Sequence, residues 1–384
     1  MLPGDANTMP PITIAGAGIA GLTLGRCLAH KGIPSILLER HDSSPRYNYG
    51  VTLHPWAYQP LLLVLQMDET TFRKRLAVDA PRGGTEAFTG DTMSAGSEIS
   101  PRTFRCHRGK LERLLQEGQD IRWKHGIKSV DVSQRNVTVE IADEKTIETK
   151  VLIGTDGVHS QVRKSLAPDI QPKVLPYVVF NGKRSVSLKE YEETLVSHME
   201  DSTIMESRHE DILLQITVNE FAESKVYLGY TYSRPVRPPS DPLHRPERAM
   251  SGAMETPEDF FIEIQNLQGL KQGFKEIFDV EKVRNDRILH WLMRSSLGSR
   301  EESQKLADRG VLLVGDAVHA MPILGGEGAN HAMKDGVELA EHLAANGSDG
   351  SRTFVNARYD AWEKGVEQSE SRLSEMHIPS RASL

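Results

Sequence analysis

Residues Pro11–Glu39 read PITIAGAGIAGLTLGRCLAHKGIPSILLE. In this stretch a short β-branched run is followed by Gly16, Gly18 and Gly21, which have the spacing G-x-G-x-x-G, and then by a segment rich in alanine and leucine. This order predicts a strand, a tight turn and a helix. A second apolar run ends at Glu39, so the whole stretch predicts two parallel strands joined by a helix.

Each glycine has a physical task in such a unit. Gly16 makes the turn, Gly18 removes a side chain where a pyrophosphate would touch the backbone, and Gly21 lets the helix pack close to the strand. The helix N-terminus offers free N–H groups and a partial positive charge to phosphates. Glu39 lies roughly 20 residues beyond the glycines, where a carboxylate accepts a hydrogen bond from a ribose hydroxyl. The stretch therefore predicts a dinucleotide site rather than a βαβ unit that is only structural.

Composition excludes several classes of protein. The chain has 384 residues, 38% of them hydrophobic and 26% charged, which is typical of a globular protein with room for two domains. Its formal charge of −7 offers no basic field for nucleic acid, and two cysteines, Cys27 and Cys106, are too few for a disulfide framework. Residues 1–10 lack the pattern of a signal peptide, and no apolar run approaches the ~18 residues of a membrane span. We therefore expect a cytoplasmic protein without nucleic-acid or membrane partners.

Local patterns predict elements between the site segments. The apolar stretch at 53–67 predicts a helix that begins at Pro60. The leucines of 104–116 fall on one helical face, with Arg108 at the entry to that helix. Alternating apolar residues in 127–141 predict a hairpin.

Two later segments have a common form, in which a buried strand is followed by glycine and aspartate. Residues 151–163 read VLIGTDGVHSQVR, with Asp156 directly after the strand. In 310–343 a second such strand precedes Asp316, and a helix opens near Gly328. Asp316 is well placed to accept a hydrogen bond from a polyol or ribose hydroxyl, and the helix N-terminus would stabilise negative charge.

The three segments together resemble the three fingerprints of single-component FAD-dependent monooxygenases with the p-hydroxybenzoate hydroxylase-like fold. Their order and spacing match over about residues 11–345. In that family the first motif holds ADP, an arginine that opens a later helix contacts the pyrophosphate side, the Asp-Gly segment supports FAD and NAD(P)H, and the aspartate of the Gly-Asp motif binds the ribityl chain. The resemblance implies cofactor-binding roles for Gly16, Gly18, Gly21, Glu39, Arg40, Val51, Arg108, Asp156, Asp316, Pro322, Gly328, Ala329 and Asn330.

The resemblance also implies the fold, an α/β protein with a Rossmann-type FAD-binding domain and an inserted α+β substrate domain built on a β-sheet. We expect residues 1–170 and 286–350 in the FAD-binding domain, 171–285 in the substrate domain, and 351–384 in a C-terminal helix and tail. Within the substrate domain, β-rich stretches predict the sheet, and 257–278 predicts a helix that covers the cleft.

Few residues of the substrate domain point to its ligand. Arg184 resembles a family position near the flavin, where it would orient the substrate, and Tyr227 is the second catalytic candidate. Solvent-exposed arginines and interface tyrosines without a catalytic role are an open alternative for these positions. Further candidates for the pocket are Tyr230, Arg294, His54 and Trp56.

Other catalytic arrangements lack sequence support. The histidines are scattered without metal-ligand spacing, so we expect no metal. His319 lies near Asp316, but no serine lies in a G-x-S-x-G elbow, and the aspartate is better used as an acceptor for FAD. The lack of a W-x-W-x-I-P segment disfavours a flavin halogenase.

The resemblance implies an NAD(P)H-consuming monooxygenase. Hydride from NADPH or NADH would reduce FAD, and one oxygen atom of O2 would enter an electron-rich aromatic ring or alkene. A flavin oxidase or dehydrogenase on the same fold, and a redox-neutral FAD-binding protein, are alternatives that the motifs do not separate. The family alone favours NADPH over NADH, and the assembly is expected to be a monomer or a homodimer.

Three positions depart from the family pattern. Glu327 stands where relatives commonly carry a neutral residue, Val318 replaces a small residue, and His331 stands on the helix that faces the flavin. A carboxylate near reduced flavin is electrostatically unfavourable unless it points to solvent. These departures suggest a loop adapted to a specialised substrate, such as a secondary metabolite.

Overall fold

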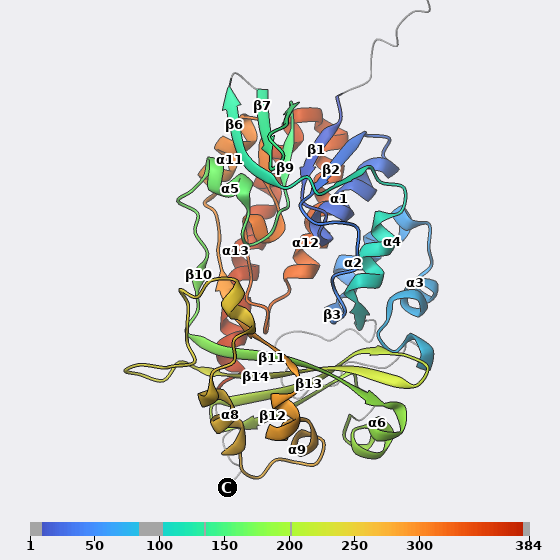
Figure 1. Cartoon of the computed structure of the whole chain (residues 1–384). Coiled ribbons are helices and arrows are strands. Elements are labelled where there is room, and N and C mark those ends of the chain that lie inside the picture. The colour runs from blue at the N-terminus through green and yellow to red at the C-terminus, as the bar shows by residue number, and fades with distance from the viewer. Residues whose placement is uncertain (1–9, 84–102, 134–135, 200–201, 379–384) are drawn as a thin grey trace, which may run out of the picture.

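The computed structural model describes residues 10–83, 103–133, 136–199 and 202–378 (Figure 1). Residues 1–9, most of the stretch considered for a signal peptide, lie outside this part of the chain. The described elements form one part built on a parallel sheet and a second part built on an antiparallel sheet (Figure 1). The parallel sheet has the order β17 (Val311–Leu313), β9 (Leu152–Gly154), β1 (Ile12–Ala15), β2 (Ser35–Glu39) and β5 (Ile121–Trp123).

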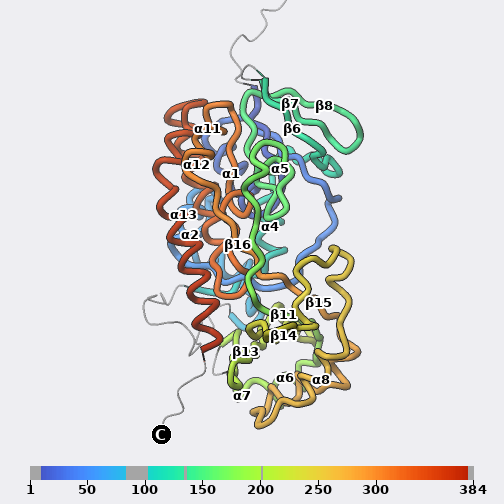
Figure 2. Tube along the Cα trace, turned by 90° about the vertical axis from the view of Figure 1, so that its left-hand side faces the viewer, coloured from blue at the N-terminus to red at the C-terminus, as the bar shows by residue number. Residues whose placement is uncertain are grey.

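The parallel sheet is covered on both faces, which explains its continuous apolar strands. Helix α1 (Ile19–His30) follows β1 and packs against α12 (Gly328–Asn346). In Figure 2, α11, α12 and α13 lie on one side of this part of the molecule and a three-stranded sheet on the other. That sheet and the remaining elements of this part are β6 (Ile127–Ser133), β7 (Asn136–Ile141), β8 (Thr146–Thr149), α2 (Pro55–Leu65), α3 (Glu69–Leu76), η1 (Ala80–Arg82), α4 (Arg108–Gln116), α5 (Gln161–Leu166), α11 (Arg300–Asp308), η3 (Gly315–Ala317) and η4 (Gly347–Asp349).

The antiparallel sheet has two different faces, because side chains alternate along each strand. Phe180 and Ile216 belong to an apolar cluster on one face, whereas Asn181 and Thr217 line a cavity on the other. The strands, in sheet order, and the short helices of this part are β12 (Ile204–His209), β13 (Ile212–Phe221), β14 (Lys225–Pro235), β11 (Tyr177–Ser187), β15 (Arg287–Trp291), α6 (Leu188–Thr194), α7 (Val196–Met199), η2 (Ser251–Met254), α8 (Glu258–Gln265), α9 (Phe274–Ile277) and α10 (Val280–Arg284).

The prediction of one helix at 257–278 that covers the cleft is wrong in two respects. The structure has two helices there, α8 and α9, and both lie on the far side of the antiparallel sheet from the parallel sheet (Figure 1). Phe260 of α8 and Phe274 of α9 join Phe180 in the apolar cluster. Their apolar faces therefore match the apolar face of the sheet and leave its polar face to the cleft.

Three further elements connect the two parts. The ribbon of β3 (Gly50–Leu53) and β4 (Phe104–His107) is antiparallel, as is the short pair of β10 (Lys173–Val174) and β16 (Arg294–Ser295). The expected C-terminal helix is α13 (Gly350–Glu375), which runs along the first part and ends beside the second (Figure 2). There Leu373 packs in a cluster with Val179 and Met293. None of the helices in the described ranges combines the length and the apolar character needed to cross a membrane.

Helix α2 begins at Pro55 and not at Pro60, as we had expected. Pro55 lies in the first helical turn, where its missing N–H costs nothing. The N–H of His54, the residue before the helix, donates to Asn330 Oδ1 at 2.9 Å, which fixes the start of α2 at this point. Pro60 lies inside the helix.

The division into domains stays a prediction. Strand β15 pairs with β11 of the antiparallel sheet, although it lies beyond the boundary expected after residue 285. A boundary placed after β15 would keep that sheet within one domain.

Candidate active site

The glycine turn after β1 has the geometry of a dinucleotide site. Gly16 has φ +106°, and a Cβ there would lie 2.7 Å from the carbonyl oxygen of Thr155. A Cβ on Gly21 would lie 2.1 Å from the carbonyl oxygen of Gly16, whereas one on Gly18 would meet no atom within 4 Å. Helix α1 has no side-chain cap, which leaves its first N–H groups free for a ligand in the open space at Gly18.

Glu39 is held beside this turn. Its buried carboxylate accepts hydrogen bonds from the N–H of Ala17 at 2.9 Å and of His41 at 3.0 Å. Arg40 is exposed, and its Nε lies 3.0 Å from Nε2 of His41. Glu39 therefore lies at the end of β2 where a ribose hydroxyl is expected, whereas Arg40 extends along the surface.

The second segment packs directly on the first. The hydroxyl of Thr155 donates to the carbonyl oxygen of Gly16 at 2.9 Å. Asp156 Oδ2 accepts from the N–H groups of Gln161 at 2.6 Å and Val162 at 3.3 Å, and its Oδ1 is buried without a partner among the described residues. Burial raises the pKa of Asp156, although hydrogen bonds from Ser160, Val162 and Gln161 oppose this shift. An orphaned acceptor beside the glycine turn fits a site that a ligand completes.

A buried arginine joins the second segment to the third. Arg163 donates from Nη1 to the carbonyl oxygen of Ala317 at 2.8 Å and from Nη2 to that of Val158 at 2.5 Å. The sequence motif had shown Arg163 only as a residue near the start of α5. Its contacts fix the distance between the Asp-Gly and Gly-Asp turns.

A buried carboxylate that we did not predict holds the Gly-Asp turn. Asp335 Oδ2 accepts from Gly315 N at 3.3 Å and lies 2.5 Å from His319 Nε2, and Oδ1 accepts from Arg358 Nη2 and Trp362 Nε1 at 2.9 Å each. Although burial opposes ionisation, His319 and Arg358 hold the pKa of Asp335 far below its ordinary value. Asp335 thereby fixes the backbone of the turn that carries Asp316, the residue expected to bind the ribityl chain.

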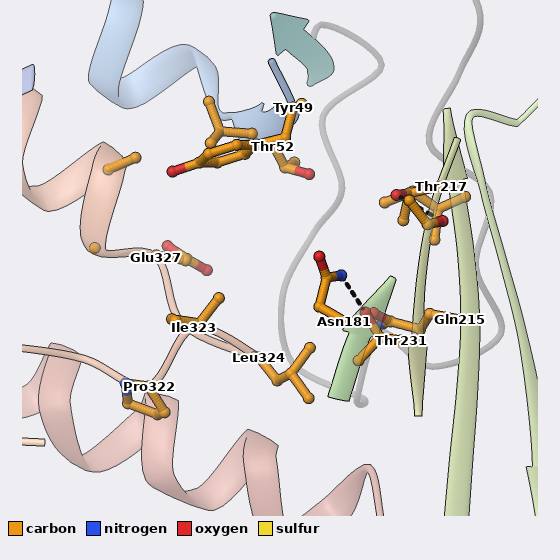
Figure 3. Close-up of a pocket in the computed structure, with 18 of the residues that line it drawn as sticks. Tyr49, Thr52, Asn181, Gln215, Thr217, Thr231, Pro322, Ile323, Leu324 and Glu327 are labelled. Carbon is orange, nitrogen blue, oxygen red and sulfur yellow. Dashed lines mark hydrogen bonds between the residues drawn. The ribbon is translucent and has the colours of Figure 1, made fainter. Parts of the chain in front are cut away.

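A cavity of about 380 Å³ lies between the two parts of the molecule. Figure 3 shows the loop before α12 on one side of it and the polar face of the antiparallel sheet on the other. On the loop side are Pro322, Ile323 and Glu327, and on the sheet side are Asn181 and Thr217. The predicted cofactor residues that line this cavity are Val51, Arg108, Asp316, Pro322, Gly328, Ala329 and Asn330.

Asn330 joins two segments of the cavity wall through its side chain. Its Nδ2 donates to the carbonyl oxygen of Thr52 at 3.0 Å, and its Oδ1 accepts from the N–H of His54. The end of β3 is thus bound to the start of α12. His54 lines the cavity, as one of our candidates, and burial lowers its pKa while the nearby Glu327 opposes that shift.

Arg108 and Asp316 face the cavity from different segments. Arg108 Nε donates to Glu112 Oε1 at 2.9 Å, and its guanidinium lies 3.8 Å from the ring centroid of Tyr47 and bonds Tyr49. Asp316 is open to the cavity but surrounded by protein, and the loss of hydration raises its pKa, an effect that His319 and Arg108 partly oppose. Asp316 therefore has acceptor capacity that no group in the described part of the chain uses.

The other predicted cofactor residues lie outside the cavity lining. They cluster at the ends of β1, β2 and β9, where parallel strands present a ligand site. These residues are Gly16, Gly18, Gly21, Glu39, Arg40 and Asp156.

Neither predicted catalytic residue lines the cavity. Arg184 lies on the apolar face of the sheet, where Nε donates to Asp286 Oδ2 at 2.9 Å and Tyr230 donates to the same oxygen at 2.8 Å. Strand alternation turns Arg184 away from the cavity, and its expected place near the flavin stays a prediction. Tyr227 shares the strand face of Thr231 but lies beyond the lining. Trp56 stacks on His54 outside the lining, with ring centroids 6.2 Å apart.

The polar floor of the cavity was not predicted. Its side chains come from four strands and have in common only that they lie on the same face of the sheet. The alternating pattern would have predicted these residues if it had been known which face of each strand is buried. Asn181 Nδ2, for example, donates to Thr231 Oγ1 at 3.0 Å (Figure 3). The residues of this floor are Asn181, Lys183, Glu206, Gln215, Thr217, Asn219 and Thr231, and Arg105 of β4 lies beside them.

The three departures from the family pattern have different surroundings. Glu327 forms an ion pair with Arg372 of α13, and its Oε1 lies 3.8 Å from His54 Nε2. Burial lowers the pKa of His331 to about 4, so this ring is neutral at pH 7. Val318 is buried in the core.

The glycine turn lies beside an acid at the end of β2, and the third segment opens on a cavity between two sheets. Together they are typical of a flavin-binding oxidoreductase fold. The family model described as "FAD binding domain" matches residues 9–360. The chain belongs to this FAD-binding family, and the match covers most of its length.

Curated relatives align with this chain over nearly their whole length. The FAD-dependent monooxygenase adaC of Aspergillus niger is 32% identical over 394 residues, which cover 97% of this chain and 94% of that protein. The FAD-dependent monooxygenase nscC of Aspergillus fumigatus is 31% identical, with 96% of each chain covered. This chain is accordingly a FAD-dependent monooxygenase.

Solved structures show the same fold. The 2,6-dihydroxypyridine-3-hydroxylase of Arthrobacter nicotinovorans superposes with a TM-score of 0.73 at 18% identity and covers 98% of this chain and 96% of its own. Klebsiella pneumoniae HpxO, solved with FAD and uric acid, superposes with a TM-score of 0.71 at 15% identity, covering 98% of this chain and 91% of its own. The fold class expected from the sequence is confirmed.

Proposed function

We propose that this FAD-dependent monooxygenase inserts one oxygen atom of O2 into an electron-rich aromatic or alkene small molecule, with NADPH or NADH as the reductant. The observation that carries the proposal is the cavity itself. One wall contains the predicted flavin contacts Asp316 and Gly328, and the opposite wall is the polar sheet floor. A volume of about 380 Å³ is of the size used for small-molecule sites.

The residues present fit FAD. The open space at Gly18, the uncapped α1 and the held carboxylate of Glu39 suit the ADP part, and Asp316 offers an acceptor to the ribityl hydroxyls. Bound FAD supplies hydride acceptance and O2 activation. The chain itself orients the substrate with the amides and hydroxyls of the floor, and the walls on both sides limit the access of water.

Cations around the Asp-Gly turn support transient docking of the nicotinamide nucleotide there. Burial lowers the pKa of His159 in this turn, and the nearby charges of Arg294, Lys164 and Arg40 lower it further. The guanidinium of Arg294 has no hydrogen-bond or ion-pair partner in the described ranges. An anionic pyrophosphate would compensate this positive charge. The chain has only one G-x-G-x-x-G, which is assigned to FAD. This fits a nicotinamide nucleotide that docks transiently, because such docking needs no second Rossmann unit.

The alternative reactions are distinguished by the source of the electrons. A flavin oxidase or dehydrogenase would take them from its substrate, and a redox-neutral FAD-binding protein would take none. A cytoplasmic location, a monomeric or homodimeric state, the choice of NADPH and a secondary metabolite as substrate stay predictions.

The test is anaerobic stopped-flow spectroscopy of the purified yellow protein. NADPH or NADH alone should bleach the bound FAD without a partner reductase, and candidate aromatic substrates should accelerate the bleaching. Incorporation of 18O from 18O2 into the product would then distinguish a monooxygenase from an oxidase. If a substrate bleaches the flavin while neither nucleotide does, the proposed reaction must be withdrawn.

A further inference from the structure

Among the described residues, five hydrogen-bond donors meet at the buried carboxylate of Asp335 in α12. Two belong to the Gly-Asp turn, where Gly315 N lies 3.3 Å and His319 Nε2 lies 2.5 Å from Oδ2. The other three belong to α13, where Arg358 Nε, Arg358 Nη2 and Trp362 Nε1 lie 3.1, 2.9 and 2.9 Å from Oδ1. One carboxylate oxygen therefore serves the turn, and the other serves the C-terminal helix.

The carboxylate must be ionised to serve all five donors. An ionised carboxylate only accepts hydrogen bonds, whereas a protonated one would turn its own O–H toward another donor. Although burial opposes ionisation, His319 and Arg358 hold the pKa of Asp335 far below its ordinary value. The negative charge that the arrangement needs is therefore present at neutral pH.

An amide at this position cannot replace the carboxylate. It has one acceptor oxygen, and its NH2 group would face either the donors of the turn or those of α13. His319 can adapt by moving its ring proton to Nδ1, which is buried without a partner among the described residues. The N–H of Gly315 has no such alternative, so an amide that faces the turn leaves this buried donor unpaired.

The turn that Asp335 holds carries Asp316. Gly315 and Asp316 are neighbours in η3, and Gly315 has φ +61°. Arg163 holds the other side of this turn, because its Nη1 donates to the carbonyl oxygen of Ala317 at 2.8 Å. A shift of the turn would therefore move the acceptor that we expect to bind the ribityl hydroxyls.

The C-terminal helix reaches the same turn by a second contact. Helix α13 packs against α12, and Figure 2 shows the two side by side. The indole of Trp362 stacks on the ring of His319, with centroids 5.1 Å apart. The position of α13 is therefore coupled to the turn both through Asp335 and through this stack.

We propose that Asp335 is a positioning residue for FAD, which holds Asp316 in place for the cofactor and makes FAD binding depend on the C-terminal helix. The proposal rests on the expected contact between Asp316 and FAD, and not on the reaction that the flavin carries out. It gives Arg358 and Trp362 a part in cofactor binding, although neither lines the cavity.

The test measures the Kd for FAD from the fluorescence of FAD that the holoenzyme releases on dilution. Asp335→Asn should raise this Kd about tenfold or more, because the buried N–H of Gly315 loses its acceptor and the turn shifts. Trp362→Phe should raise it about threefold, because this variant removes one bond to the carboxylate and keeps both bonds to the turn.

Two control variants lie beside these residues. Glu338 also pairs with Arg358, at 3.2 Å, but bonds no atom of the turn among the described residues, so Glu338→Gln should keep the Kd for FAD. Phe354 is buried in α13 with its ring 5.7 Å from that of Trp362. Phe354→Leu opens a cavity there without changing a partner of Asp335, so it should lower the Tm and keep the Kd.

A double variant separates positioning from a general loss of stability. Asp335→Asn combined with Asp316→Ala should have nearly the same Kd as Asp316→Ala alone, because the position of the turn matters little once its acceptor is gone. A loss that came from weakened folding would instead multiply the Kd by the same factor in both backgrounds. If Asp335→Asn gives no folded protein, Trp362→Phe takes its place in this comparison, since it keeps the carboxylate.

Several outcomes would overturn the positioning role. These are an unchanged Kd in either Asp335→Asn or Trp362→Phe, an equal rise in either control variant, and an effect of the same size with and without Asp316. A raised Kd in Asp335→Asn beside an unchanged Kd in Asp316→Ala would also do so, because the carboxylate would then act on another part of the site. None of these measurements uses NAD(P)H or O2, so this proposal and the proposed reaction can fail independently.

Discussion

Glu327 and Arg372, 45 residues apart in the chain, form an ion pair that joins the loop before α12 to the end of α13. The side chains are 18% and 26% exposed, so water screens the pair only in part. The pair removes the electrostatic objection to a carboxylate at this position, because the charge of Glu327 is balanced before any flavin is bound. It also attaches the C-terminal helix to the cavity.

The first prediction concerns this ion pair. Glu327→Gln should lower the free energy of unfolding by about 1 kcal/mol, since a partly buried pair is worth more than an exposed one. Arg372→Gln should have a similar cost, and the double variant should cost less than the sum of the two. Urea denaturation of the three variants measures this coupling. Additive effects would show that the two side chains do not stabilise each other.

The second prediction concerns FAD retention. Asp316→Ala and Glu39→Ala should each raise the Kd for FAD about tenfold or more, because each removes a charge-assisted hydrogen bond worth roughly 1.5–3 kcal/mol. Fluorescence of released FAD on dilution measures the Kd. Asp360→Ala is the matched control, since that carboxylate is 82% exposed on α13. Unchanged FAD affinity in both test variants would show that the site is misassigned.

Sequence reasoning predicted the local geometry of the glycine turn, because neighbouring residues determine it. The turn at Gly16 needs a positive φ and the close approach at Gly21 needs a missing side chain, and both requirements are visible in one short stretch. The Asp-Gly and Gly-Asp turns are local in the same sense. These parts of the site could be predicted because a strand, a turn and a helix form each of them.

The rest of the site depends on which face of a strand is buried. Arg184 and Lys183 are neighbours in β11, yet one bonds Asp286 on the apolar face and the other lines the cavity. A one-residue change of register reverses this assignment. Asp335 was missed for another reason, because its donors come from the Gly-Asp turn and from α13, which sequence patterns cannot bring together.

The third prediction concerns pH. Burial, followed by the charges of Arg248 and Arg245, lowers the pKa of His290 to about 3 in the folded protein, against about 6.5 when unfolded. Between these values the unfolded chain binds a proton that the folded chain does not, so stability is full above about pH 6.5 and falls as the pH falls. His290→Gln should reduce this slope by up to about 1.4 kcal/mol per pH unit.

Urea denaturation at pH 5, 6 and 7 tests this prediction. The other buried histidines, such as His331, contribute equally to both proteins, so the difference between the two slopes reports His290 alone. Identical slopes for the parent protein and His290→Gln would contradict the assigned shift.

The fourth prediction concerns the nicotinamide nucleotide. Arg294→Gln should raise the NADPH concentration that half-saturates anaerobic FAD reduction by about tenfold. The variant removes a cation that has no partner among the described residues and would bond an anionic pyrophosphate. The rate at saturating NADPH should change little, since Arg294 lies outside the cavity lining. Arg352→Gln is the control, because Arg352 pairs with Asp308 on the exposed surface. If FAD reduction depends on the NADPH concentration in the same way in Arg294→Gln and Arg352→Gln, the nucleotide docks elsewhere. The cations around His159 then have another role.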